Sequence, residues 1–574
     1  MFKNRLSKVI AGIAVGGAML LVVAGCGPAT QPGSSPAGVT QEQQPDSRSK
    51  AAVEVAKERG GKVVMSAGQS PFGNPNDPHL YYAGIGRSYA VPVTNLIVTR
   101  DIYDPKGPII GDLAKSWEIS KDGKTYTFKF QEGVKFHNAP PVNGREFTSE
   151  DAKYSLMRLT ADSSVIVEKW KPRFQRATEF PKFKSIETPD KYTLVINLEE
   201  PYAPLLDSIA YTGTLILPRE FVESFPEKII TEGMIGTGPF MPVEYKNQQI
   251  ATYKKNPDYW KKDSQGGQVP YLDAIELLNF TDPQAAVAAF RARNIDIMAP
   301  NKTNFDVLKK EIPGANALIT NTVSFMNFRL NVTAKPLDDV RVRRAMHLAV
   351  DRQQFRDLIS EGLSTISGPV TAPVYPDVAN TMDWLMSQPG YRQPKDQDIT
   401  EAKRLLKEAG YENGFNVEFL VLSGSEDIAT LLADQMKRIN VDVKVQVQDY
   451  AGVVLPRMTA GDFQIGYGAG ISMGTDVDSV LAPSFTTGGS RNYSKYSNPT
   501  IDDLVKKEQR ALTIEERRRY AQEVEKIVFE EAPAIFVYPL TNLMLAQPWV
   551  HNANKGIIAS SELQMFNNVW VEKH

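Results

Sequence analysis

Residues 111–130 read GDLAKSWEISKDGKTYTFKF, and this stretch decides the local fold. Apolar and polar residues alternate through residues 126–130, as they do in a strand that buries one face. Asp122 and Gly123 stand between that run and residues 117–120, and such a pair is typical of a tight turn because glycine adopts positive φ. The stretch therefore predicts a β-hairpin.

The hairpin pattern recurs twice in the first half of the chain, whereas the second half alternates strands with helices. The further hairpins are predicted at residues 185–188 with 192–198, and at residues 238–240 with 250–253. The strand, helix and strand of the second half are predicted at residues 417–422, 428–439 and 441–445. This order favours α/β units with helices flanking a sheet, and two such lobes joined by a hinge suit it.

A further helix is predicted at residues 398–409 from its start and stop signals. Asp398 followed three residues later by Glu401 resembles a capping box, in which side chains bind the free N–H groups of the first turn. Gly410 follows the last apolar residue and suits the left-handed conformation that ends many helices. We therefore expect Asp398 at the start of this helix and Gly410 at its end.

Length, charge and cysteine content exclude several classes of protein. A chain of 574 residues is too long for one ordinary core. The formal net charge of -2 provides no basic surface for phosphates, so no nucleic-acid partner is expected. The single cysteine, Cys26, allows no disulfide within the chain and no cysteine-based metal site. We expect neither a metal nor a cofactor.

The first 26 residues have the pattern of an export signal. Three basic residues within the first eight positions precede an apolar run at residues 9–24, which is too short for a comfortable membrane span. The run ends in VAGC at residues 23–26, which resembles the bacterial lipobox, where the cysteine thiol receives a diacylglyceryl group. We predict a lipoprotein signal peptide at residues 1–26 with lipidation of Cys26; an uncleaved N-terminal helix is the alternative.

The segment after the cysteine predicts a flexible tether. Residues 27–59 are rich in glycine, proline, serine and glutamine and cannot bury enough apolar surface to fold. As flexible coil, about 30 residues span roughly 30 Å. No later apolar segment is long enough to span a bilayer. We expect an extracytoplasmic body held by its lipid to the outer face of the cytoplasmic membrane.

Four stretches, in order along the chain, resemble one known family. They are residues 111–137 with 147–151, residues 236–240 with 256–260, residues 336–345 with 349–352, and residues 496–502 with 532–535. Together they look like the extracellular solute-binding proteins of the dipeptide, oligopeptide and nickel type, which serve ABC importers. The resemblance covers nearly the whole chain after about residue 60. The stretches themselves suit structural roles, such as a tight start of a strand at GTGPF.

The resemblance implies an α/β fold of the periplasmic-binding-protein type, class II, with two lobes joined by a two-strand hinge. Lobe one is expected to be enlarged by a hairpin-rich subdomain. The expected boundaries are residues 60–280 plus 541–574 for lobe one, about 95–235 for its subdomain, and 281–540 for lobe two, with crossovers near residues 281 and 540.

The resemblance also implies a mechanism and partners. The ligand would be enclosed between the lobes, so that binding shifts the population toward a closed form. The permease transmembrane subunits of an ABC importer would recognise that form. We therefore expect a monomer that delivers a small solute to a membrane transporter.

The ligand class depends on one loop. Peptide-binding members of the family receive the peptide's α-amino group on an acidic residue, and an ungapped count puts Met473 at that position and Gly470 at a tryptophan position. A thioether cannot neutralise a buried ammonium group, so an ordinary peptide is disfavoured unless the loop is shifted and Asp476 substitutes. The ligand is either a peptide or, given Met473, an oligosaccharide or other non-peptide solute.

Further candidates for the cleft are side chains that offer an apolar face, a hydroxyl group or a charge. They are Tyr81, Tyr82, Phe325, Asn327, Tyr467, Arg491 and Tyr493, together with Asn492 and Trp384. Each of these residues also fits ordinary packing, and the sequence leaves that alternative open.

Enzyme motifs do not occur in the sequence. The histidines show no H-E-x-x-H spacing, and there is neither a G-x-S-x-G elbow nor a Walker A loop. Paired carboxylates such as Asp338-Asp339 stand at predicted helix starts, where capping accounts for them. We predict that the protein is not an enzyme. A secreted hydrolase with dispersed carboxylates and a surface receptor of the same fold without a transport role remain as alternatives.

Overall fold

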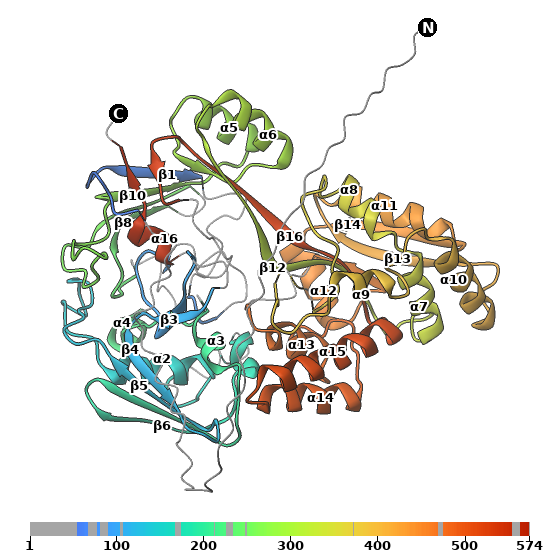
Figure 1. The fold of residues 1–574 in the computed structure, drawn as a ribbon, viewed down its shortest axis with the longest axis horizontal. Coiled ribbons are helices and arrows are strands. Elements are labelled where there is room, and N and C mark those ends of the chain that lie inside the picture. The colour runs from blue at the N-terminus through green and yellow to red at the C-terminus, as the bar shows by residue number, and fades with distance from the viewer. Residues whose placement is uncertain are drawn as a thin grey trace, which may run out of the picture. The chain divides into compact units, whose positions relative to one another are not determined.

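One ten-stranded sheet is shared by two lobes in the body of the chain (Figure 1). The computed structural model describes residues 54–66, 77–80, 90–103, 107–166, 171, 174–211, 213–225, 234–246, 249–370, 372, 374–468, 474–553 and 563–572. All of them belong to the single unit formed by residues 41–574. Cys26, Tyr81, Tyr82, Gly470 and Met473, named above from the sequence, lie outside the described residues.

The strands of the large sheet follow the order β14-β13-β15-β12-β16-β11-β1-β10-β9-β8. Their bounds are β1 Lys62–Ser66, β8 Phe240–Lys246, β9 Ile250–Lys255, β10 Ala274–Leu278, β11 Ile297–Met298, β12 Asn316–Leu330, β13 Phe415–Leu422, β14 Val441–Gln448, β15 Ile465–Tyr467 and β16 Ala534–Ala546. In lobe two β13 is parallel to β14 and β15, and in lobe one β1 is parallel to β10 and β11. The predicted two-lobed α/β fold is thereby confirmed.

Strands β12 and β16 are antiparallel to each other and connect the lobes (Figure 1). Their pairing is interrupted in the middle: Asn321 stands opposite Thr541, and the next pair is Phe325 with Pro539. Three residues of β12 therefore face only Leu540 of β16. Such a bulge breaks the hydrogen-bond ladder locally and lets the strand bend.

The segment that follows the predicted crossover near residue 281 pairs with a strand from the start of the chain. Helix α5 (Pro283–Arg291), β11 and helix α6 (Lys302–Glu311) come before β12, and β11 pairs with β1 of lobe one. Both helices pack with Leu543 and Leu545 of β16 in one apolar cluster. This segment therefore lies against the strands β1 and β16.

The first two predicted hairpins are confirmed and form a separate four-stranded antiparallel sheet in lobe one, in the order β4-β5-β7-β6. Their bounds are β4 Ala114–Ile119, β5 Thr125–Phe130, β6 Phe183–Asp190 and β7 Thr193–Leu198. Gly123 has a φ of 67° in the turn between β4 and β5, as the turn chemistry predicts. The third predicted hairpin is β8 with β9, in the large sheet.

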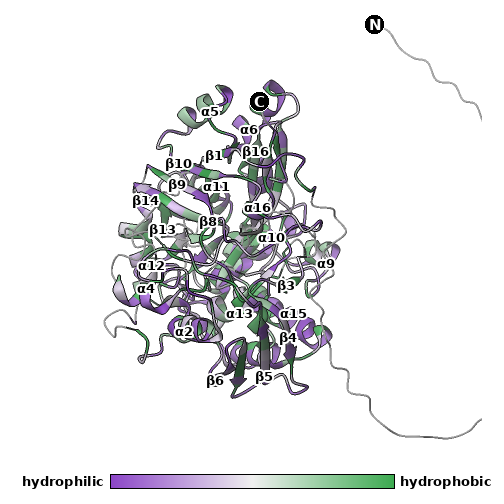
Figure 2. Ribbon diagram, turned by 90° about the vertical axis from the view of Figure 1, so that its left-hand side faces the viewer, coloured by the Kyte–Doolittle hydropathy of each residue, from purple (hydrophilic) through white to green (hydrophobic). Residues whose placement is uncertain are grey.

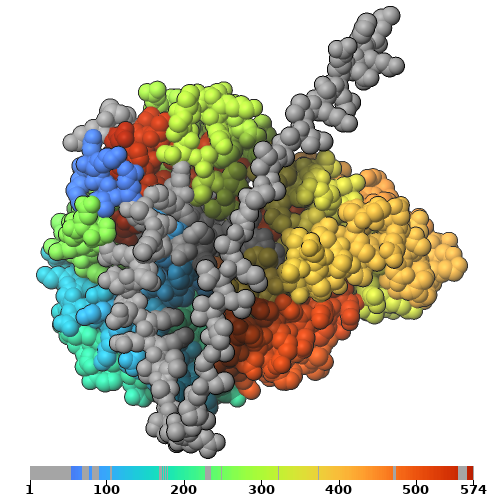
Figure 3. Space-filling model, in the orientation of Figure 1, coloured from blue at the N-terminus to red at the C-terminus, as the bar shows by residue number. Residues whose placement is uncertain are grey.

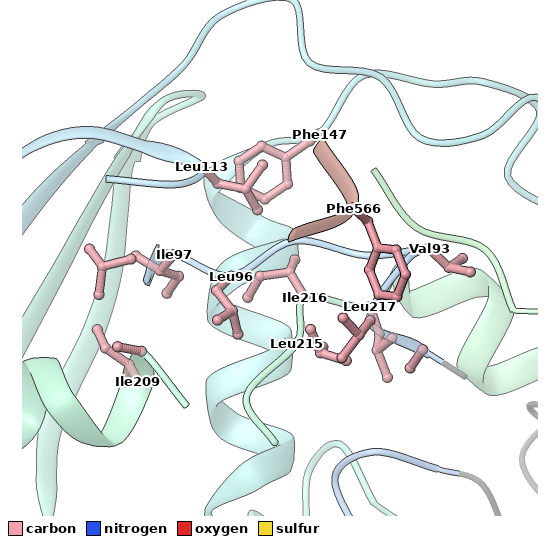
Figure 4. Close-up of a cluster of buried hydrophobic side chains, with 14 of the residues drawn as sticks. Val93, Leu96, Ile97, Leu113, Phe147, Ile209, Leu215, Ile216, Leu217 and Phe566 are labelled. Atoms are coloured by element: carbon pink, nitrogen blue, oxygen red, sulfur yellow. The ribbon is translucent and has the colours of Figure 1, made fainter. Parts of the chain in front are cut away.

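The remaining elements of lobe one are short. They are β2 Val98–Arg100, β3 Ile109–Gly111, α2 Ser149–Leu159, the 3-10 helix η2 Gln175–Glu179, α3 Leu205–Ile209, α4 Arg219–Ser224, β17 Val550–His551, α16 Leu563–Asn568 and β18 Trp570–Val571. Figure 4 shows part of the core of lobe one, in which Phe566 of α16 lies beside Val93 and Leu217. Burying such a side chain stabilises the fold by about 1.5–3 kcal/mol.

The two glycines of the GTGPF stretch lie against the backbone of another segment. A Cβ atom on Gly236 would lie 2.3 Å from the carbonyl oxygen of Val93, and one on Gly238 would lie 2.4 Å from its carbonyl carbon. Backbone atoms cannot move aside as a flexible side chain can. This close approach explains why the stretch uses glycine on both sides of Thr237.

Lobe two adds helices to both sides of its part of the sheet. They are α7 Val340–Ala349, α8 Arg352–Leu358, α9 Met382–Ser387, α10 Asp396–Glu408, α11 Glu426–Lys437, the π-helix η3 Tyr450–Val454, α12 Leu455–Ala460, α13 Asp478–Phe485, α14 Pro499–Arg510 and α15 Ile514–Glu531. The predicted strand–helix–strand run is confirmed as β13, α11 and β14.

The start of α10 differs from the prediction. The helix begins two residues earlier than Asp398, with Lys395 at its N-cap position. Asp398 is fully buried and accepts hydrogen bonds from Arg392, from Lys395 Nζ at 2.7 Å and from the backbone N of Gly390 at 3.0 Å. The capping-box prediction is therefore wrong, because this carboxylate binds the preceding loop. Gly410 ends the helix with a φ of 86°, as predicted.

In Figure 2 many residues around α13 are hydrophobic, whereas α2, at the edge of the molecule, carries hydrophilic residues. In the described part of the chain, no helix is both long and apolar enough to cross a membrane.

Candidate functional site

A cavity of about 510 Å³ lies where the two lobes meet. Elements η2 and α3 line it on lobe one, and α13 and α14 line it on lobe two. In Figure 3 the orange-red surface that includes α13 and α14 lies beside the surface of lobe one. Its walls carry charged groups from both lobes, among them Arg176, Glu179 and Asp207 on one side and Asp476 and Asp478 on the other. The cavity is therefore a candidate ligand site to which both lobes contribute.

Direct contacts hold the lobes together beside this cavity. They are the hydrogen bond from Tyr202 Oη to Asp478 Oδ2 at 2.8 Å, the hydrogen bond from Ala203 N to Gln509 O at 2.8 Å, and the ion pair of Arg510 with Glu200. The Tyr202 hydroxyl also lies 3.1 Å from the backbone oxygen of Glu179. Both oxygens are acceptors, so the single phenol hydrogen can serve only one of them at a time.

Asp207 is the most connected residue of this interface. It lies on α3 and binds Arg100 of its own lobe, whose Nε donates at 2.8 Å. It also accepts from lobe two, from Thr475 Oγ1 at 2.9 Å and from the backbone N of Asp476 at 2.7 Å. One buried carboxylate thus fixes the loop before α13 against lobe one.

Asp476, the predicted substitute for the amine anchor, is already neutralised. Both of its carboxylate oxygens accept from Arg517 of α15, at 2.7 and 2.6 Å. Burial alone would raise the pKa of Asp476, but the ion pair with Arg517 outweighs it and holds this pKa below its usual value. A carboxylate held in this way is not free to receive a ligand's ammonium group.

Two neighbouring carboxyl groups have raised pKa values. Burial, with the charge of Asp476 acting in the same direction, raises the pKa of Asp478 to about 6. Burial also raises the pKa of Glu508 on α14 well above its usual value, although Glu508 is paired with Arg517. Arg517 therefore balances a group of three buried carboxyls, of which only Asp476 is held firmly ionised.

The raised pKa of Asp478 predicts a pH dependence of stability. A carboxyl with a pKa of about 6 in the fold and roughly 4 in the unfolded chain binds its proton more tightly in the fold. The contribution of Asp478 to the unfolding free energy should therefore fall as the pH rises from about 4 to 6 and stay level above that range, with a total change of about 3 kcal/mol. Urea unfolding at pH 4.5 and pH 7.5 measures it.

Asp478→Asn provides the matched variant for this measurement, because it resembles the protonated side chain. We expect the variant to gain stability relative to the parent protein at pH 7.5 but not at pH 4.5. Asp503→Asn, at an exposed position on α14, serves as the control. An equal difference between parent and Asp478→Asn at both pH values would contradict the prediction.

A cluster of arginines lies around and beside Glu179, a residue that lines the cavity. Glu179 of lobe one accepts from Arg176 Nε at 3.1 Å and from Arg491 Nη2 of lobe two at 3.0 Å. Arg329 of β12 lies close enough to Arg491 and Tyr493 for their charges to affect its pKa. Two buried guanidinium groups therefore bind the carboxylate of Glu179, and a third, that of Arg329, lies near Arg491.

The predicted site residues on β12 and β15 fall into different environments. Phe325 is a core residue whose ring packs on Phe536 with centroids 5.8 Å apart. Asn327 is buried and donates to the carbonyl of Phe325, while its Oδ1 has no partner among the described residues. Tyr467 packs on Phe328 at the edge of the lobe-two core.

Of the remaining predicted site residues, Arg491 and Tyr493 lie near Arg329, whereas Trp384 lies elsewhere in lobe two. Tyr493 is half-buried beside Arg491 and Arg329. Asn492 donates to the backbone oxygens of Thr486 and Tyr496 and stabilises its own loop. Trp384 stacks on Phe529 of α15, and it does not line the cavity.

Sequence reasoning did not find several residues of this interface. They are Glu179, Tyr202, Asp207, Arg329 and Arg517. Arg329 alone had a local signal, because it lies two residues after Asn327, and side chains two apart in a strand share a face. The others lie on elements whose pattern shows only that they are helices or loops.

Metal chemistry has no ligand set among the residues whose placement is described: no group of three histidine, cysteine or acidic side chains could hold an ion. The histidines of the interior are neutral packing residues. Burial, for example, lowers the pKa of His137 to about 4.

The family of the chain follows from its comparison with known proteins. The family model of the bacterial extracellular solute-binding proteins, family 5 middle region, matches residues 108–492. The chain belongs to this family. The chain is similar to the heme-binding protein A of Haemophilus influenzae, with 28% identity over 74% of this chain and 77% of that protein. It is also similar to the dipeptide-binding protein of Escherichia coli, with 26% identity over 80% of this chain and 86% of that protein.

Solved structures share the fold of this family 5 member. DppA of Helicobacter pylori, in complex with the peptide STSA, has a TM-score of 0.74 at 24% identity and covers 90% of this chain and 99% of its own. AgaA from A. tumefacien R10, in complex with agropinic acid, has a TM-score of 0.73 at 22% identity, with coverages of 90% and 99%. The same architecture thus holds different ligands in different proteins.

Proposed function

We propose that the protein is the substrate-binding lipoprotein of an ABC importer and captures a small solute between its lobes. The observation that supports this most is the charged cavity closed by direct contacts between lobes. The interrupted pairing opposite Leu540 offers a place where the lobes can pivot. A solute that touches both lobes favours the closed form, which the permease would then recognise.

The proposal also assigns a role to each segment of the chain. Lobe one would comprise residues 60–321 and 541–574, and lobe two the residues between them, with the pivot at the bulge of β12. Residues 1–26 would be the signal peptide, and Cys26 would carry the lipid that holds a monomer outside the cytoplasm. Residues 27–53 would then be the tether. The predicted end at residue 59 is too late, because Asn552 Nδ2 donates to the backbone oxygen of Glu54 at 2.8 Å and Arg59 pairs with Asp263 at 2.8 Å.

We propose a solute other than an ordinary peptide with a free amino terminus. The acidic group that could substitute for the amine anchor, Asp476, is occupied by Arg517. An oligosaccharide or another non-peptide solute is the first candidate. A peptide is the second, because relatives are named for dipeptides and for heme alike.

A thermal-shift screen of the full chain in detergent micelles tests this proposal. The probes are dipeptides, oligosaccharides, opine-like conjugates and nickel chelates. A ligand at 100 times its Kd adds about 2.7 kcal/mol to stability, which is readily detected. A shift with non-peptide solutes and none with free dipeptides is expected; a shift with dipeptides alone would contradict the choice of ligand.

Two further observations separate the alternatives. Conversion of the bound solute into a product by the purified protein would identify a hydrolase. Co-purification of permease subunits with the protein from its native membrane is expected for an importer. Their absence, with ligand binding retained, would identify a surface receptor.

Removing the hydroxyl group that bridges the lobes should weaken ligand binding. Tyr202→Phe loses the hydrogen bond to Asp478, and a bond to a charged group contributes about 1.5–3 kcal/mol. Because a smaller closed population lowers apparent affinity, we expect the Kd of the screened ligand to rise roughly tenfold, as measured by isothermal titration calorimetry.

Tyr192→Phe is the matched control. It removes a similar hydrogen bond, from the Tyr192 hydroxyl to Glu146 at 2.7 Å, but one that lies wholly within lobe one. Its Kd should equal that of the parent protein. Equal effects of the two substitutions would show that the Tyr202 contact does not stabilise closure.

A further inference from the structure

Arg329 is a buried cation with almost no partner. Arg329 is 1% exposed, and among the described residues its one hydrogen bond is from Nη2 to Ser484 Oγ at a long 3.4 Å. Nε and Nη1 have no partner, and no carboxylate of the described residues pairs with this guanidinium. A buried charge in this state costs several kcal/mol, so a missing anion is the simplest explanation.

A second and a third guanidinium group increase the positive charge. Arg491 is 3% exposed and near enough to oppose the protonation of Arg329, whose pKa is lowered to about 10 mainly by burial. Arg176 lies across the lobe boundary, and its Nη1 has no partner among the described residues. Glu179 is the carboxylate that both Arg176 and Arg491 share. The cluster therefore keeps a net positive charge.

The described acidic groups near this cluster already have partners of their own. Glu179 is shared by Arg176 and Arg491, and Asp476 and Asp478 face Arg517 and Tyr202. Among the described residues no carboxylate pairs with Arg329, so an anion of the solute is suited to compensate its charge.

We propose that Arg329 and Arg491 form a subsite that binds an oxyanion of the solute, a carboxylate or a phosphate. This inference rests on the proposed solute-binding function and narrows the solute to an anionic one. Guanidinium groups suit such ligands because their planar N–H groups bind two oxygens at once. The hydroxyl of Tyr493, which lies beside both arginines, can add one more donor.

The arrangement also provides access to the subsite. Glu179 belongs to lobe one, whereas Arg329 and Arg491 belong to lobe two. When the lobes separate, Glu179 moves with lobe one away from Arg491 and from Arg329 near it. The solute's oxyanion then reaches them before closure, and Glu179 returns to Arg491. Closure with a neutral solute leaves Arg329 unpaired, so the cluster selects for anions.

Arg329→Met tests the subsite, because it keeps the volume and removes the charge. The full chain in detergent micelles is melted in sodium phosphate, in sodium glutarate and in sodium chloride of equal ionic strength. We expect the parent protein to show a saturable rise in its melting midpoint with at least one oxyanion. Without oxyanion, Arg329→Met should have a higher melting midpoint than the parent protein. It should need at least a tenfold higher oxyanion concentration for the same rise in midpoint.

Arg344→Met is the control, since it makes the same substitution at an exposed position on α7 and should respond like the parent. Tighter binding of glutarate would assign a carboxylate solute, and tighter binding of phosphate a phosphorylated one. Arg329→Gln replaces the methionine variant if the latter fails to fold.

Two results would overturn the inference. One is a lower midpoint of Arg329→Met without oxyanion together with a parent-like response, which would make Arg329 a structural cation. The other is a parent protein that responds to neither oxyanion. If a neutral solute from the screen binds the parent protein and Arg329→Met equally, the anion subsite is refuted while the importer function stands. If the oxyanion effect is found but permease subunits fail to co-purify, the importer function is refuted while the subsite stands.

Discussion

Arg517→Met should lower the unfolding free energy by roughly 3–5 kcal/mol, which is the cost of removing one partner from a buried ion pair. Arg517 binds both oxygens of Asp476 and also pairs with Glu508. Without it, Asp476 keeps a buried negative charge with no cation to balance it at that side. Urea unfolding monitored by circular dichroism at pH 7.5 measures the loss.

The control for this change is Arg519→Met, two residues further along α15. Arg519 is exposed and lies over the ring of Tyr520 with 4.6 Å to the centroid, so its loss should change stability by no more than about 0.5 kcal/mol. Asp476→Asn should rescue part of the loss in Arg517→Met, because it removes the unpaired charge. No rescue by Asp476→Asn would contradict the electrostatic explanation.

Cys26→Ser should move the protein from the membrane fraction to the soluble fraction. The proposed lipid is attached through the cysteine sulfur, and serine cannot form that thioether. One acyl chain binds membranes only marginally and two or more bind stably, so losing all of them removes the anchor. Cell fractionation with immunodetection measures the distribution, and incorporation of labelled palmitate measures the modification.

Ser34→Ala, in the same segment, should leave both readouts unchanged. Retention of Cys26→Ser in the membrane fraction would show that the apolar run at residues 9–24 stays attached as an uncleaved helix. Failure of the parent protein to incorporate palmitate would lead to the same conclusion.

The local elements were predictable to different extents. The hairpin of β4 and β5, its turn at Gly123 and the end of α10 at Gly410 were confirmed, since each depends on residues close together in sequence. The prediction that Asp398 caps α10 was wrong. A short acidic side chain can cap a helix or form a buried ion pair, and the position of the preceding loop decides between the two.

The lobe boundary shows the same limit over a longer range. Residues 283–311 have helical patterning like that of lobe two, yet β11 pairs with β1, which is more than 200 residues earlier. Periodicity reports which face of an element is buried, but not which partner buries it. The crossover at β12 was therefore found only from the pairing of the strands.

The sequence by itself determined much of the order of strands and helices, the family and the class of protein, because these depend on local pattern and on motifs in fixed order. The tertiary structure alone decided which charges meet: Asp476 with Arg517, Tyr202 with Asp478, and Arg329 with no carboxylate of the described residues. Such pairs join residues up to 276 positions apart. Their formation depends on strand register and on the docking of two lobes, which short-range patterns do not encode.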